Sequence, residues 1–179
     1  MSGDSLPLDL PLSRFATDSC EATDLYRELH QPLLRYLAGL GLSADEAQDV
    51  AQDAFLSLHK HLSEGGSQAN IRSWLFRVAH NRARNCQLSY AQRMGEPLDP
   101  AFDTASTDAT PEQAVLAKEK VRQLASAVRS LAEQERECLM LRAEGLRYRE
   151  IGEVLGIPTS TVSDLVERAI KKLAEKCNV

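Results

Sequence analysis

The chain has 179 residues, 43% of them hydrophobic and 5% aromatic, with a formal net charge of −5. This composition excludes a wholly disordered chain, the length allows one medium or two small domains, and the few aromatic residues favour helices over a β-sandwich. No apolar run approaches the roughly 18 residues of a membrane span, and the first residues lack a secretory signal, so we expect a cytoplasmic protein. The four scattered cysteines form no CxxC pair, which favours free thiols, mostly as small core residues.

The first predicted helix follows a tail. Residues 1–20 are rich in Pro, Ser and Asp and are expected to be loose. Residues 24–41 then carry leucines at helical spacing and end in two glycines, which predicts a helix that stops near Gly39 and Gly41. Pro32 lies inside this pattern, which allows a kink or a helix that starts there.

A second helix is predicted from the sequence SADE. Ser43 can cap it, and Glu46 can reach back to complete a capping box. One face carries an apolar stripe of Ala47, Val50, Ala51, Ala54, Leu58 and Leu62. The other face places Leu56 among acidic and polar residues, which indicates either a docking point for a basic partner or a plain solvated face.

The charge of the chain alternates in blocks. Residues 1–64 carry 4 basic and 11 acidic residues, residues 65–95 carry 5 and none, and residues 96–117 carry none and 5. Such blocks indicate either surfaces for different partners or ordinary solvated faces. The basic block is predicted to be one helix from about Asn70 to about Arg93, after a flexible connection SEGGSQAN. Its core-facing residues are expected to be Leu75, Val78, Ala79 and Cys86, with Trp74 as a further candidate.

An acidic linker separates two predicted domains. Residues 95–110 contain prolines, Asp, Ser and Thr, and no basic residue. Thr110 can cap the next helix, Pro111 suits its first position, and Gln113 completes a capping box. A second domain is therefore predicted from residue 111.

The second domain is predicted to contain four helices. They span about 111–129, 133–143, 148–155 and 159–175. The last two are joined by a short turn at Gly156, with the small residue Gly152 where they would cross closely. This pattern is typical of a DNA-binding helix-turn-helix, and the alternative is an ordinary helical hairpin.

The motifs of enzymes are missing from the sequence. There is no GxGxxG, GxxxxGK[ST], HExxH or GxSxG. His59 and His61 have a poor spacing for sharing a metal ion. We therefore expect a protein that is not an enzyme and has no cofactor and no metal site.

Two stretches resemble a known family. IRSWLFRVAHNRARN is similar to the signature (F/I)RxWLxxIAxNxxxD, and SLAEQERECLMLRAEGLRYREIGEVLGIPTSTV resembles LPxxxRxxxxLRxxEGxSYxEIAxxLGIPxGTV. Both are patterns of the extracytoplasmic-function (ECF) class of bacterial RNA polymerase sigma factors, in the sigma-70 family. The resemblance covers nearly the whole chain after residue 20. It implies an all-α fold with sigma domain 2 at 21–94 and sigma domain 4 at 111–179.

The resemblance also implies binding sites. In the family, the acidic helix grips a coiled coil of core RNA polymerase, and the basic stretch and the loop before it face the −10 element, where one base is flipped out. The core-polymerase residues would be Asp49, Gln52, Asp53, Leu56 and His59. The −10 residues would be Gly66, Ser67, Gln68, Asn70, Arg72, Trp74, Arg77, Asn81 and Arg84. Trp74 has two open roles, core packing and support of the flipped base.

The second domain would read the −35 element, and here the chain departs from the family. The usual continuation GTVKSRLxRARxxL is replaced by STVSDLVERAIKKL, so that Ser163, Asp164 and Leu165 stand where basic residues are expected. An acidic residue repels phosphates but can accept from a cytosine amino group, which suggests a diverged −35 preference. The −35 residues would be Arg147, Arg149, Thr159, Ser160, Thr161, Ser163, Asp164, Arg168, Lys171 and Lys172.

The resemblance implies a sigma factor that binds core polymerase, directs it to promoter DNA and assists melting. An anti-sigma factor would restrain it, the acidic linker would thread the RNA exit channel, and the chain itself would make no membrane contact. Two alternatives remain. One is a helix-turn-helix regulator that binds duplex DNA as a dimer, which would leave the basic stretch unexplained. The other is a sigma-like protein that titrates polymerase without initiating.

Overall fold

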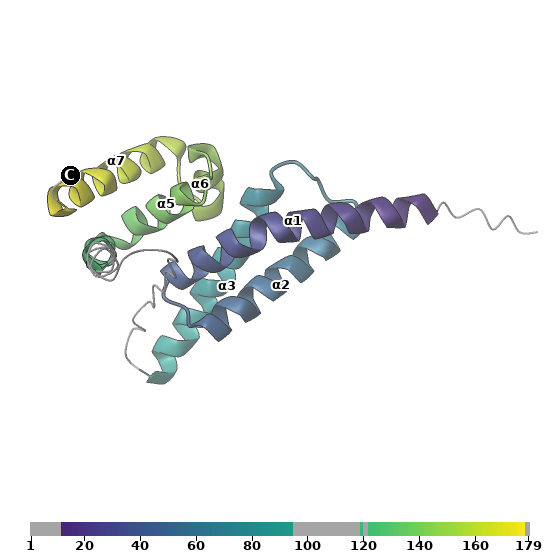
Figure 1. The fold of residues 1–179 in the computed structure, drawn as a ribbon, viewed down its shortest axis with the longest axis horizontal. Helices are drawn as coiled ribbons and strands as arrows, with labels where there is room; N and C mark the ends of the chain where they lie inside the picture. The colour runs from purple at the N-terminus through teal and green to yellow at the C-terminus, as the bar shows by residue number, and fades with distance from the viewer. Residues whose placement is uncertain (1–11, 95–118, 120–121, 178–179) are drawn as a thin grey trace, which may run out of the picture.

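A computed structural model describes residues 12–94, 119 and 122–177, and all regular structure in these ranges is helical. Figure 1 shows two groups of helices, with α1, α2 and α3 in the first and α5, α6 and α7 in the second. The predicted all-α class is therefore confirmed. The proposed linker at 95–110 and the cap at Thr110 lie outside the described residues.

The first domain begins with α1, which spans Leu12–Gly39. The tail predicted for residues 1–20 is wrong from Leu12 onward, because the helix starts there. The Pro, Ser and Asp content of residues 1–20 suggested a loop, but Ser13, Asp18 and Ser19 lie within α1. Pro32 lies inside α1, and the helix ends where predicted, since Gly41 adopts a left-handed φ of 97°.

Helix α2 spans Ala44–Ser63 and starts at the predicted capping box. The backbone N–H of Glu46 donates to Ser43 Oγ at 3.3 Å, and the backbone N–H of Ser43 donates to Glu46 Oε2 at 2.9 Å. The predicted apolar stripe is buried from Ala47 to Leu58, while Leu62 is partly buried. It packs in one core with the buried leucines of α1.

Helix α3 spans Ile71–Met94. Asn70, predicted as its first residue, has a left-handed φ of 59° and precedes the helix instead. Cys86 is exposed and does not face the core. The next residue, Gln87, faces the end of α1 and donates from Nε2 to the Leu40 carbonyl at 2.5 Å. The buried side chains of α3 include Leu75, Phe76, Ala79 and Ala83.

The second domain has the predicted helices. Residues 122–129 are helical, and α5, α6 and α7 span Glu133–Ala143, Tyr148–Leu155 and Thr159–Cys177. Helix α6 ends at Gly156, whose left-handed φ of 69° makes the turn into α7. A Cβ at Gly152 would lie 2.7 Å from the carbonyl oxygen of Ile157, so only glycine lets the backbone approach this closely.

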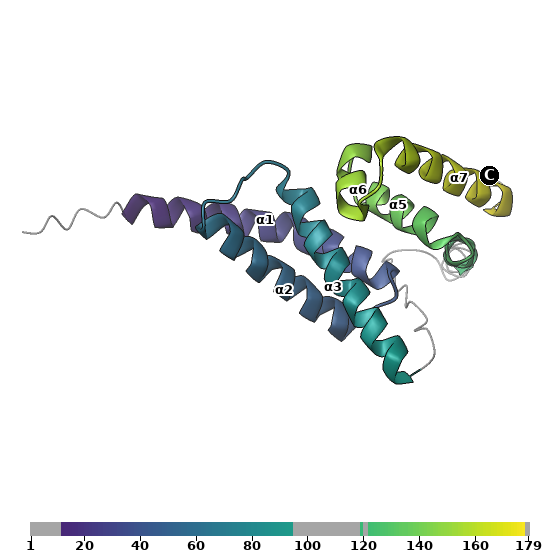
Figure 2. The same cartoon turned by 180° about the vertical axis from the view of Figure 1, so that it is seen from behind.

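The two domains contact each other. Helix α3 packs against α6, and α1 also touches α5, as Figures 1 and 2 show from opposite sides. One connected cluster of buried residues runs through both domains. The helix-turn-helix is thus held against the basic helix α3.

We expect Gly152→Ala to lower the free energy of unfolding by roughly 1–3 kcal/mol, the usual cost of overpacking. The new methyl group would press on backbone, which cannot move aside. Gly39→Ala is the matched control, because a Cβ there would meet the flexible end of the Met140 side chain. Urea denaturation of both variants measures the difference, and equal losses would contradict this account of Gly152.

Candidate functional site

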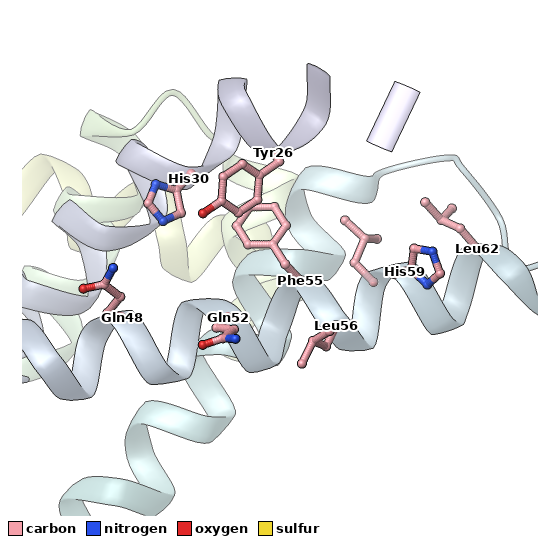
Figure 3. A pocket seen from close by; sticks show the side chains of 9 residues that line it. Tyr26, His30, Gln48, Gln52, Phe55, Leu56, His59 and Leu62 are labelled. Atoms are coloured by element: carbon pink, nitrogen blue, oxygen red, sulfur yellow. The ribbon is translucent and has the colours of Figure 1, made fainter. Parts of the chain in front are cut away.

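The α2 face consists of the five residues predicted from sequence: Asp49, Gln52, Asp53, Leu56 and His59. All five are exposed, and Leu56 has 62% of its surface in contact with solvent. They lie along one side of α2 beside a cavity of about 430 Å³. Figure 3 shows Leu56, Gln52 and His59 at this cavity, below the side chains of α1.

Aromatic rings line the cavity. The ring of Tyr26 stacks on His30 at 4.6 Å between centroids and lies 4.7 Å from the ring of Phe55 (Figure 3). Sequence reasoning missed these three residues, although the spacing of Tyr26 and His30 by four placed them on one face of α1. An apolar cavity beside exposed acidic residues suits a partner helix with apolar and basic side chains.

One acidic residue of the α2 face is engaged within the domain. Asp53 Oδ2 accepts from Arg82 Nη1 at 2.8 Å, and Arg82 Nη2 donates to Ser57 Oγ at 3.1 Å. Arg82 therefore joins α3 to α2 and holds its charge away from the other arginines of α3. Among the exposed acids of this face, Asp49 is the one whose charge is not paired within the described residues.

The connection between α2 and α3 lies over a stacked pair of rings. His61 packs on Trp74 at 4.7 Å between centroids and an interplanar angle of 19°. A Cβ at Gly66 would collide with the His61 ring, so the connection passes directly over it. The predicted residues Ser67, Gln68 and Asn70 are exposed, whereas Trp74 is half-buried. Trp74 therefore packs under His61, whose ring contacts the connection at Gly66.

The α3 face consists of the predicted residues Arg72, Arg77, Asn81 and Arg84. Two of them are free to meet a ligand, and two are bound by other parts of the protein. Arg77 and Asn81 are exposed, and within the described residues no acidic side chain pairs with Arg77. Arg72 Nη2 instead donates to the Glu144 carbonyl at 2.6 Å. Arg84 forms ion pairs with two glutamates of α5.

A buried polar pair lies beneath this face. The Tyr36 hydroxyl and His80 Nδ1 form a hydrogen bond of 2.8 Å between α1 and α3. Burial and, to a smaller extent, the charge of Arg84 lower the pKa of His80, Glu133 opposes the shift, and the resulting pKa is about 4. His80 is therefore neutral at pH 7, and the hydrogen bond joins two uncharged groups.

The α7 face consists of the predicted −35 residues that lie on α7: Thr159, Ser160, Thr161, Ser163, Asp164, Arg168, Lys171 and Lys172. Thr159, Ser160, Asp164, Arg168 and Lys171 are exposed, and Thr161 and Ser163 are partly buried. Leu165, which stands where the family has a basic residue, is buried in the domain core. Of the three replaced positions, Ser163 and Asp164 are therefore the two that change the surface of α7.

Two predicted basic residues are engaged by acidic neighbours. Lys172 Nζ donates to both carboxylate oxygens of Glu135 at 2.8 and 2.7 Å, and this bond lowers the pKa of the Glu135 carboxyl. Arg149 forms an ion pair with Glu153 at 3.3 Å on α6. The positive charge available beside α7 thus falls mainly on Arg147, Arg168 and Lys171.

The depressed pKa of His80 predicts how stability depends on pH. In the unfolded chain His80 has a pKa near 6.5 and binds a proton below that pH. In the folded protein the same side chain stays neutral until the pH is much lower, so acid favours the unfolded state. This contribution is complete above pH 6.5 and is lost as the pH falls toward about 4. We expect the free energy of unfolding to fall less steeply across this window in His80→Gln than in the unaltered protein. His59→Gln, at an exposed position, should keep the original slope, and equal slopes in all three proteins would contradict the prediction.

Comparison with known proteins identifies the family. A family model described as Sigma-70 region 2 matches residues 25–93, and one described as Sigma-70, region 4 matches residues 121–173. RNA polymerase sigma factor YlaC of Bacillus subtilis (strain 168) is 32% identical over 154 residues, which are 85% of this chain and 88% of YlaC. The ECF RNA polymerase sigma-E factor of Escherichia coli (strain K12) is 26% identical over 140 residues, 73% of each chain.

A solved structure has the same fold. It contains the sigma factor RpoE of Bartonella quintana in complex with the anti-sigma factor NepR, at a TM-score of 0.64 and 23% identity, and covers 88% of this chain and 98% of that one. No described helix is long and apolar enough to cross a membrane. With both sigma regions matched in order on two helical domains, the chain belongs to the sigma-70 family of RNA polymerase sigma factors, in its extracytoplasmic-function class.

Proposed function

We propose that this chain binds core RNA polymerase through the α2 face, the −10 element through the α3 face and the connection before it, and the −35 element through the α7 face. The observation that carries this division is that the three surfaces lie on different helices of two domains, each with exposed side chains suited to its partner. The domains would be 21–94 and 111–179, joined by the linker 95–110. As a sigma factor, the chain initiates transcription without catalysing a reaction.

The α2 face supports binding to the coiled coil of core polymerase. Leu56 projects into solvent beside the aromatic cavity, with Asp49 exposed nearby. An apolar side chain that is desolvated on binding contributes most to affinity when it lies at the centre of a contact with a polar rim. Leu56 has this position, and the acidic rim would orient a basic helix.

The α3 face supports contact with the melted −10 strand. Arg77 and Asn81 are exposed on one side of α3, the helix that follows the connection at 64–70. Each arginine that neutralises a phosphate releases counterions and adds roughly one unit to the salt dependence of binding. Ser67, Gln68 and Asn70 offer hydrogen-bonding groups to a flipped base, and the His61–Trp74 stack below them fixes the connection.

The α7 face supports a −35 preference that differs from that of the family. Thr159 and Ser160 begin the helix, and Asp164 lies one turn further on. Arg147 and Lys171 would supply phosphate contacts at either end. A carboxylate in the major groove can accept from a cytosine amino group, so Asp164 would favour a site with cytosine.

An anti-sigma factor is the partner that we propose for regulation. The Bartonella RpoE structure contains NepR, described as an anti-sigma factor. A partner of this kind would cover the α2 face and the α3 face together. The acidic linker would occupy the RNA exit channel as a polyanion. A bacterial cytoplasm is the location that fits these roles.

Run-off transcription tests the proposed function. Purified core polymerase is incubated with a library of bacterial promoter fragments, with and without this protein. New discrete start sites are expected. Binding to core without new transcripts would instead support a protein that titrates polymerase. Asp164 is the observation that favours this alternative, because its charge repels DNA phosphates. A shift of duplex DNA without binding to core would indicate a conventional helix-turn-helix regulator.

We expect Leu56→Glu to weaken binding to core polymerase by about tenfold or more, because it removes a central apolar contact and adds charge among acids. Leu88→Glu is the matched control, since Leu88 is 63% exposed on α3 and lies outside the α2 face. Fluorescence-detected titration of core measures both. Equal losses in the two variants would show that the α2 face is not the docking surface.

We expect Asp164→Lys to bind duplex DNA more tightly, to raise the salt dependence of binding by about one unit and to change the selected −35 sequence. Glu175→Lys makes the same change of charge near the end of α7 and serves as the control. Selection from a randomised duplex library measures the preference. The idea fails if Asp164→Lys selects the same −35 sequence with unchanged affinity.

A further inference from the structure

His61, near the end of α2, holds the first part of the connection at residues 64–70. Its ring stacks on Trp74 of α3 with 4.7 Å between centroids and an interplanar angle of 19°. A Cβ at Gly66 would collide with Cε1, Nε2 and Nδ1 of the same ring at once, which places the Gly66 backbone over the ring. The His61 carbonyl also accepts from the Gly66 N–H at 2.8 Å. His61 therefore contacts Gly66 with both its backbone and its ring.

Trp74 holds the other end of the connection. Its backbone N–H donates to the Asn70 carbonyl at 3.0 Å, and Asn70 has the left-handed φ of 59° that is uncommon outside glycine. The Trp74 ring is half-buried and packs against the apolar core, so it is itself held in place. Both ends of the connection are thus tied to one unit, the stacked rings of His61 and Trp74.

Three exposed residues lie between the two fixed ends: Ser67, Gln68 and Ala69. The Ala69 N–H donates to Ser67 Oγ at 3.1 Å, which closes a small turn. So short a segment between two fixed points has few backbone conformations, because each residue spans at most about 3.3–3.6 Å. The Ser67 hydroxyl and the Gln68 amide are therefore offered to solvent from a backbone of fixed shape.

Selection among bases needs such a fixed backbone. Phosphate contacts hold a strand whatever its sequence, whereas base discrimination depends on hydrogen-bonding groups held within about 0.5 Å of their working geometry. A mobile loop discriminates less, because ordering it uses part of the binding free energy. Resting on the proposed role of the connection in −10 binding, we propose that His61 is a positioning residue for base selection. Its ring fixes Gly66, and through it the Ser67 hydroxyl and the Gln68 amide, against an unpaired base.

An exchange between the ring and a methyl group tests this role. Gly66→Ala adds a methyl group that collides with the His61 ring, and Gly66 has no positive φ that would otherwise exclude alanine. In the double variant with His61→Ala the ring is gone and the methyl group has room. His61→Phe keeps a flat ring on Trp74. Ser63→Ala is the matched control, at an exposed position of the same end of α2.

Two measurements separate base selection from general binding. Each protein, in complex with core RNA polymerase, selects from promoter DNA whose −10 segment is pre-melted and randomised. Sequencing of the bound DNA gives the ratio of the favoured base to the least favoured base at each position. Fluorescence anisotropy with a labelled single-stranded oligonucleotide of mixed sequence gives the overall affinity, which depends on phosphate contacts. Thermal unfolding establishes that each variant is folded at the temperature of the assay.

We expect His61→Ala and Gly66→Ala each to lower the base ratio by about tenfold at the position that the connection reads, the usual effect of losing a base-specific contact. The overall affinity should change by less than about threefold, because the arginines of α3 remain. His61→Phe and Ser63→Ala should keep the ratio within about twofold, since the stacked ring is retained in both. In the double variant the second substitution should add little to the loss, because the ring and the methyl group no longer meet.

Three results would overturn the positioning role. One is an unchanged base ratio in His61→Ala. Another is a loss in His61→Phe equal to that in His61→Ala, which would show that the ring does not act by stacking. The third is a parallel fall of base ratio, overall affinity and thermal stability, as expected for a residue that only stabilises the fold. Failure of the proposed function is distinct, because the unaltered protein would then select no base in the −10 segment and run-off transcription would give no start sites.

Discussion

The positive charge of α3 is the constraint on which the arrangement of this protein depends. Residues 65–95 contain five arginines and no acidic residue, so α3 cannot neutralise its own charge. Its partners come from other helices: Asp53 of α2 binds Arg82, and glutamates of α5 bind Arg84. The first pairing stabilises the domain, and the second joins the two domains. Arg77, which has neither kind of partner among the described residues, keeps its charge for a ligand.

Features with local causes could be predicted from the sequence. The capping box of Ser43 and Glu46, the helix end near Gly41 and the turn at Gly156 each depend on a few neighbouring residues. The start of α1 at Leu12 was missed because composition suggested a tail, whereas the chain there continues the helix. Asn70 was placed one residue inside α3 because spacing alone does not reveal its left-handed φ.

Features that depend on packing between distant segments could not be predicted. Helical periodicity placed Leu56 and its neighbours on one face of α2, but the cavity beside them exists only because Tyr26 and His30 of α1 lie against Phe55. The pairing of Arg84 joins residues about fifty positions apart in sequence, and nothing near Arg84 indicates it. Lys172 was likewise predicted to contact DNA, but in the fold its ammonium group donates to the Glu135 carboxylate.

These pairings limit the strength of each binding surface. Lys172 and Arg149 are neutralised by neighbouring glutamates, and Asp164 opposes the phosphates, so the α7 face retains a modest positive charge. On the α3 face, Arg77 is exposed and pairs with no acidic side chain of the described residues. Weak surfaces joined in one chain bind strongly when a common partner engages them together, because each contact raises the local concentration of the next. Core polymerase, for which we propose the α2 face as the docking surface, would supply that common platform.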